Sequence, residues 1–146
     1  MTEQARDTVA LIRDQIAKHP VLLYMKGTPQ FPQCGFSARA VEALSQIGRP
    51  FAYVNILENQ DIRATLPQIA NWPTFPQLWV NGELIGGSDI MLEMFQNGEL
   101  KPLVEQYSPA PEAYAYKANL LIGFFITYNL NRYNETSLRR PNLILK

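Results

Sequence analysis

The sequence predicts an α/β protein in which a four-stranded mixed β-sheet is flanked by about five helices. A strand, a helix and a second strand follow one another over residues 21–56, which predicts a parallel pair with a right-handed crossover. The Asn-Gly dipeptide at 81–82 stands between two apolar runs and predicts an antiparallel hairpin. Helical spacing of apolar residues recurs between and after these strands.

The first predicted helix ends before Pro20, which cannot continue it. Its apolar face is formed by Ala5, Val9, Ile12 and Ile16. The run "VLLYM" at 21–25 has the length and the uninterrupted apolar character of a strand that is covered on both faces.

The second predicted helix covers 35–48 and stops at Gly48, and "FAYVNI" at 51–56 is the second buried strand. The segment 58–72 has helical spacing again. Pro67 within it is expected either to kink this helix or to split it into two short pieces.

The hairpin strands are expected at 75–80 and 83–86. A helix follows with Ser88 as its N-cap and Gly98 as its end. A last helix is indicated over 100–107 by an apolar face with i, i+3, i+4, i+7 spacing.

A boundary is expected near Ser108, so that residues 1–107 form the domain and 108–146 a C-terminal extension. Residues 1–107 hold 8 basic and 11 acidic side chains, a balance of −3, whereas 108–146 hold 5 and 2, a balance of +3. The extension begins with a linker-like stretch and is expected to be poorly packed. Its uncharged segment at 118–128 is too short for the roughly 20 residues that span a bilayer.

The composition narrows the classes of function. A formal net charge of zero gives no general attraction to nucleic acid or to a membrane surface. No secretory signal is expected, and one cysteine cannot form a disulfide framework, so a reducing, cytoplasmic location is predicted. The single histidine has no cysteine cluster near it in the sequence, so a zinc site within one chain is not expected.

Cys34, the single cysteine, lies between the first strand and the second helix. Unpaired N–H groups and the helix dipole at a helix N-terminus favour the thiolate, which is the nucleophilic and metal-binding form. Lys26 adds a cation if the loop folds back. A buried structural cysteine is the alternative.

Two further segments have features of a ligand site. In "WPTFPQ" at 72–77, a cis bond before Pro76 would leave the backbone of Phe75 free to pair with an extended peptide; an ordinary strand entry is the alternative. In "GGSDI" at 86–90, the N–H groups of Ser88 and Asp89 open a helix and suit a carboxylate, while the Asp89 carboxylate suits an ammonium group. A plain turn before a capped helix remains the alternative.

Together, "KGTPQFPQCGFS", "WPTFPQLWVNGELIGGSDI" and the order of elements resemble the monothiol glutaredoxins of CGFS type, within the thioredoxin-like superfamily, over residues 1–107. The resemblance implies a glutathione site with Cys34 as the active thiol. It assigns the glutathione contacts to Lys26, Arg63, Phe75, Ser88 and Asp89. Many relatives carry a cysteine where Ser88 stands, so here a resolving thiol must come from glutathione or a partner.

Three functions are compatible with this resemblance. The first is a carrier of a [2Fe-2S] cluster, held by Cys34 from each chain of a homodimer and by two glutathiones, and passed to recipient iron-sulfur apoproteins. The alternative is a glutathione-dependent thiol-disulfide oxidoreductase that removes glutathione from protein thiols. The third is an interaction module regulated by the cluster, with BolA-type proteins as partners.

Overall fold

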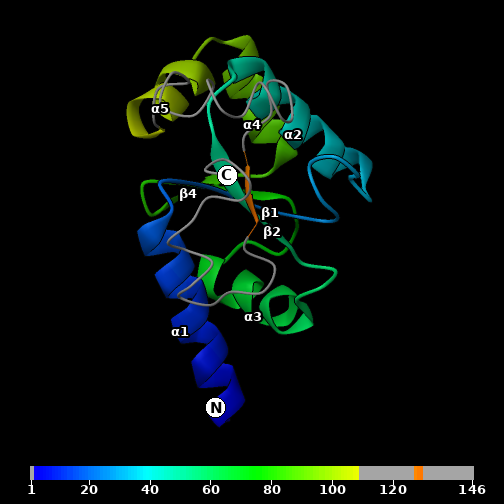
Figure 1. The fold of residues 1–146 in the computed structure, drawn as a ribbon, viewed down its shortest axis with the longest axis vertical. Helices are drawn as coiled ribbons and strands as arrows, with labels where there is room; N and C mark the ends of the chain where they lie inside the picture. The colour runs from blue at the N-terminus through cyan, green and yellow to red at the C-terminus, as the bar shows by residue number, and fades with distance from the viewer. Residues whose placement is uncertain (1, 109–126, 130–146) are drawn as a thin grey trace, which may run out of the picture.

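The computed structural model describes residues 2–108 and 127–129, which form one sheet between two layers of helices (Figure 1). The helices are α1 (Glu3–Lys18), α2 (Gly35–Ile47), α3 (Gln60–Ala70), α4 (Ser88–Gln96) and α5 (Leu100–Tyr107). The strands are β1 (Val21–Met25), β2 (Phe51–Asn55), β3 (Gln77–Val80), β4 (Glu83–Gly86) and β5 (Thr127–Asn129).

The strand order is β4-β3-β1-β2-β5. β1 and β2 are parallel, as the strand-helix-strand pattern predicts, and β3 runs antiparallel to both β1 and β4. At the hairpin, Asn81 and Gly82 both have positive φ, 51° and 80°, which is the backbone of the expected tight turn. The four predicted strands and the five predicted helices are therefore confirmed.

Alternate residues of β1 point into two separate apolar cores. Val21, Leu23 and Met25 join side chains of α2, α4 and α5 on one face. Leu22 and Tyr24 join Ile12 of α1 and side chains of α3 on the other. Because every residue of β1 is buried, the uninterrupted apolar run in the sequence follows directly from its place between the two helical layers.

The structure decides one predicted alternative and corrects one predicted detail. α3 is a single helix that contains Pro67, so of the two expected outcomes the split into two short pieces is excluded. The prediction of Ser88 as the N-cap of α4 is wrong. The helix already includes Ser88, and its N-cap is Gly87, which forms no side-chain capping bond.

β5 is a strand that the sequence analysis did not predict. It pairs in parallel with β2, with Phe51 opposite Thr127 and Tyr53 opposite Asn129. The sheet edge at β2 is thus covered by a segment of the C-terminal extension. Apart from Ser108 and β5, the extension lies outside the described residues, so its boundary and its expected poor packing stay predictions.

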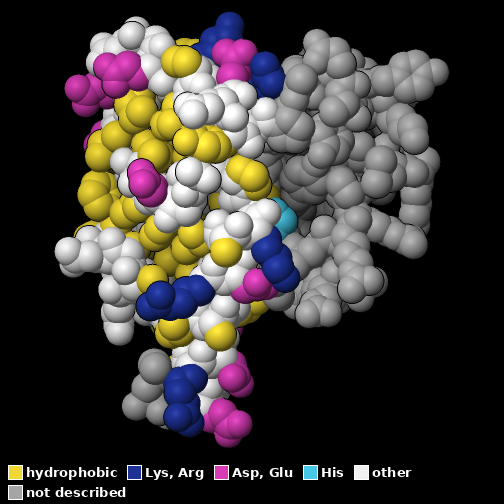
Figure 2. All heavy atoms as spheres, turned by 90° about the vertical axis from the view of Figure 1, so that its left-hand side faces the viewer, with side chains coloured by type: hydrophobic (Ala, Val, Ile, Leu, Met, Phe, Trp, Pro, Cys, Tyr) yellow, Lys and Arg dark blue, Asp and Glu magenta, His cyan; other side chains and the backbone are white. Residues whose placement is uncertain are grey.

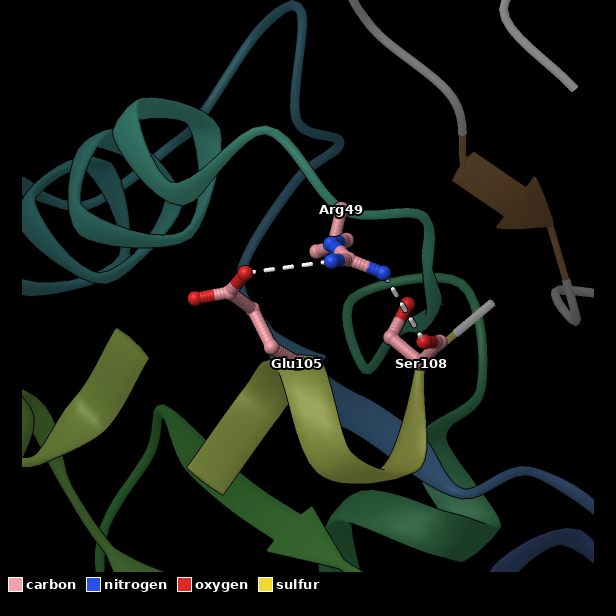
Figure 3. A network of polar contacts seen from close by, with 3 residues as sticks. All are labelled: Arg49, Glu105 and Ser108. Carbon is pink, nitrogen blue, oxygen red and sulfur yellow. Dashed lines mark hydrogen bonds and ion pairs between the residues drawn. The ribbon is translucent and has the colours of Figure 1, made fainter. Parts of the chain in front are cut away.

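The end of α5 is tied to the loop before β2 by a small polar network (Figure 3). Arg49 forms an ion pair with Glu105, with 3.0 Å from Nη2 to Oε2, and donates from Nη1 to the carbonyl of Ser108 at 3.4 Å. The hydroxyl of the buried Ser108 donates to the carbonyl of Pro50. This network holds the end of α5 against the loop before β2.

Figure 2 shows that the projecting N-terminal end of α1 carries side chains of both charges, while hydrophobic side chains gather higher on the same face. No helix within the described part of the chain is both long and apolar enough to cross a membrane.

We expect Arg49→Ala to lower the free energy of unfolding by about 1 kcal/mol, because a half-buried ion pair and a carbonyl contact are lost together. Urea denaturation of the full chain measures this. Arg13→Ala, on the exposed face of α1, is the matched control and should change the free energy much less. Equal effects of the two substitutions would show that the network adds no stability.

Candidate functional site

Cys34 is the N-cap of α2, with an extended backbone and a partly exposed free thiol. The backbone N–H of Ser37, above all, lowers the pKa of this thiol below the ordinary cysteine value. Partial burial opposes the shift, while the N–H of Phe36, the charge of Lys26 and the Ser37 hydroxyl lower the pKa further. The first turn of the helix therefore stabilises the thiolate, as the sequence predicts, and Cys34 is not a buried structural cysteine.

The buried hydroxyl of Ser37 has a second contact, because it accepts a hydrogen bond from the backbone N–H of Lys26 at 3.1 Å. The side chain thus links the end of β1 to the first turn of α2. Ser37 stands where a second sulfur would lie in a C-x-x-C motif, and here it holds the loop and the thiol together.

The loop from Lys26 to Cys34 is closed by hydrogen bonds within itself. Gln33 donates its backbone N–H to the Lys26 carbonyl at 2.9 Å, and Thr28 and Phe31 exchange backbone bonds of 3.2 and 3.1 Å. The N–H of Gly27 donates to Oδ1 of Asn55 at 2.9 Å, which anchors the loop to the end of β2.

Gly27 is required for this closure. Its φ is +91°, and a Cβ at this position would lie 2.5 Å from the Phe31 carbonyl oxygen and 2.7 Å from the Gln33 nitrogen. A larger residue at position 27 would therefore disrupt the closed loop.

Antiparallel pairing brings the remaining segments to the same end of the sheet. In the β1–β3 ladder Tyr24 lies opposite Gln77, and in the β3–β4 ladder Leu78 lies opposite Gly86. The residues after β1, before β3 and after β4 consequently meet, which places three separated sequence motifs around one site.

These motifs line one pocket of ≈ 620 Å³, a size usual for small-molecule sites. The pocket wall contains every residue for which the sequence predicts a site role: Lys26, Cys34, Arg63, Phe75, Ser88 and Asp89. Two cationic side chains, a carboxylate and the first N–H groups of α4 thus border the same space as the thiol. This set suits a ligand that carries both negative and positive charge.

The segment before β3 is held by Gln77, which the sequence analysis did not single out. The buried amide donates from Nε2 to the carbonyls of Trp72 at 3.1 Å and Thr74 at 3.3 Å, and its Oε1 accepts from Nε1 of Trp79 at 3.2 Å. The Phe75–Pro76 peptide bond is cis, as expected. A polar residue next to proline at the start of an apolar strand is the signal that could have identified Gln77.

Two further observations concern metal ligands and the turn into α4. No group of three or more His, Cys, Asp or Glu residues in the described ranges could hold a metal ion. The glycine at the end of β4, Gly86, has φ +147°, and a Cβ there would lie 2.7 Å from Cδ1 of Ile90, so the turn into α4 depends on glycine.

Comparison with known proteins identifies the relatives of this chain. The glutaredoxin family model matches residues 21–85. Glutaredoxin 4 of Haemophilus ducreyi is 65% identical over 100 residues, which are 68% of this chain and 94% of that protein. The structure of reduced poplar apo GrxS14 is 42% identical, with a TM-score of 0.63 over 73% of this chain and 97% of that one.

A buckwheat glutaredoxin–glutathione complex, 22% identical, has a TM-score of 0.64 over 73% of this chain and 94% of that one, and shows likeness of fold alone. The solved relatives confirm the thioredoxin-like fold that the sequence predicts.

The alkylation rate of Cys34 by iodoacetamide should rise with pH through a midpoint below about 8.5, the ordinary cysteine value. The sign follows from the lowered pKa, because the thiolate is the reacting form and is populated at lower pH than in an unstructured peptide. The same chain in concentrated urea is the control, since unfolding removes the N–H contacts. Identical midpoints in the folded and unfolded chain would contradict the assignment.

Proposed function

This chain belongs to the glutaredoxin family, and we propose that it is a monothiol member of CGFS type that binds glutathione and carries a [2Fe-2S] cluster. One observation carries the proposal. The single thiol of the chain has a lowered pKa and stands on the rim of a pocket whose charges complement glutathione.

Glutathione fits the groups that line the pocket. Lys26 and Arg63 bind the carboxylate at the glycine end of the tripeptide. The backbone of Phe75 pairs with the central cysteine residue of the ligand, which directs the ligand thiol toward Cys34. The first N–H groups of α4, at Ser88 and Asp89, hold the γ-glutamyl carboxylate, while the side chain of Asp89 receives the ammonium group.

The thiol count supports a shared cluster. Iron-sulfur clusters are usually held by four thiolates, and this chain provides one. Two chains with one bound glutathione each provide four, and in each chain Cys34 lies at a helix N-terminus that favours the thiolate. In this scheme the cluster is the cargo, and cysteines of a recipient apoprotein replace the glutathione and Cys34 thiolates on transfer. BolA-type proteins are further partners, and a reducing compartment such as the cytoplasm suits such ligands.

The second candidate is deglutathionylation, which the lowered pKa of Cys34 also favours. The Cys34 thiolate would attack the glutathione sulfur of a mixed disulfide, break its S–S bond and release the protein thiolate. A second glutathione thiolate would then attack that sulfur, form glutathione disulfide and restore Cys34. Without a second cysteine in the chain, each turnover depends on the external thiol.

Lys26→Ala and Arg63→Ala should each weaken glutathione binding by about tenfold or more, because a charge-assisted pair is worth roughly 1.5–3 kcal/mol. Isothermal titration of the full chain measures the change. Lys101→Ala, an exposed site on α5, is the matched control and should bind like the parent. If both pocket variants also bind like the parent, the glutathione assignment is wrong.

Anaerobic reconstitution with ferrous iron, sulfide and glutathione should give a visibly absorbing protein, and Cys34→Ser should abolish that absorption. Ser37→Ala should retain most of it, because Ser37 supplies no ligand in this scheme and its loss leaves the backbone N–H contact to Cys34 in place. A colourless parent with fast turnover of glutathione mixed disulfides would instead favour the oxidoreductase.

A further inference from the structure

Two exposed phenylalanines flank Cys34 in the sequence. In the described part of the chain, Phe31 and Phe36 are the large hydrophobic side chains with high exposure, at 74% and 54%. One precedes Cys34 by three residues and the other follows it by two. Large apolar side chains that stay exposed close to a reactive group in the chain are candidates for a contact surface.

Neither the core nor the ligand pocket accounts for Phe31. It belongs to neither apolar core, and it does not line the pocket, whereas Phe36 does. The tripeptide site therefore leaves an apolar side chain uncovered beside it.

Phe31 is also held in this exposed place. Its backbone exchanges two hydrogen bonds with Thr28, and Gln33 closes the loop onto Lys26. Because a Cβ at Gly27 would collide with the carbonyl of Phe31, this closed form depends on the glycine. A loop fixed in this way presents its apolar side chain with little further loss of conformational entropy on binding.

We propose that Phe31, together with Phe36, forms an apolar contact with a second copy of this chain. The inference rests on the proposed function, because two chains that share one cluster through Cys34 must bring the surfaces around Cys34 together. In a two-fold dimer the same patch faces itself, so each chain contributes both phenylalanines. Phe31 then stabilises the loaded dimer without contacting glutathione.

The test uses the full chain, its Phe31→Ser variant and its Phe31→Leu variant, each loaded anaerobically with ferrous iron, sulfide and glutathione. Sedimentation of a dilution series, followed at visible wavelengths, gives the dissociation constant of the loaded dimer. Titration of the unloaded proteins gives their affinity for glutathione. Since Phe31 packs in neither core, the serine variant should fold like the parent.

We expect Phe31→Ser to raise the dimer dissociation constant by about tenfold or more, since an apolar side chain loses its burial in each chain. Phe31→Leu should stay within a few-fold of the parent, and glutathione affinity should be the same in all three proteins.

A serine variant whose loaded dimer dissociates like the parent would overturn the contact, while its cluster uptake would leave the proposed function standing. A leucine variant as weak as the serine variant would overturn the apolar nature of the contact, and weaker glutathione binding by the serine variant would place Phe31 in the ligand site. A parent that takes up no cluster, or stays monomeric when loaded, would refute the proposed function and this inference together.

Discussion

The hydrogen bond from the Ser37 backbone N–H to the sulfur of Cys34 is the contact on which the site depends. It exists because α2 begins directly after Cys34, where the first N–H groups of the helix have no partner within the helix. A thiolate at this position can act as a nucleophile or as a metal ligand, and a neutral thiol is poor at both. The structure around the contact keeps the start of α2 in place and leaves the sulfur accessible.

Rigidity around the thiol comes from polar side chains that are buried at loop ends. Asn55 anchors Gly27, Ser37 binds the backbone of Lys26, and Gln77 spans the turn before β3. Each of these hydrogen bonds either joins segments that are distant in sequence or holds a loop in place. The pocket is therefore formed before a ligand arrives. A preformed pocket loses less conformational entropy when a ligand binds, which suits a site that holds a ligand next to the Cys34 thiol.

Much of this arrangement was predictable from the sequence because the signals are local. Apolar periodicity, the Asn-Gly turn and the position of Cys34 before a helix each depend on a few neighbouring residues. The predicted start of α4 was one residue too late, because serine is a common N-cap. In the structure the glycine turn before Ser88 outweighs this preference, and the helix begins at Ser88 itself. Gln77 and the pairing of β5 with β2 were missed because both depend on contacts between segments that only the folded chain brings together.

The proposed shared cluster fixes the stoichiometry of the loaded protein, which native mass spectrometry of the reconstituted full chain measures. A site that one chain cannot complete predicts a single loaded species with two chains, two glutathiones, two irons and two sulfides, which separates into monomers when glutathione is removed. A loaded species that contains one chain, or that keeps its irons after all glutathione has been lost, would contradict the shared site.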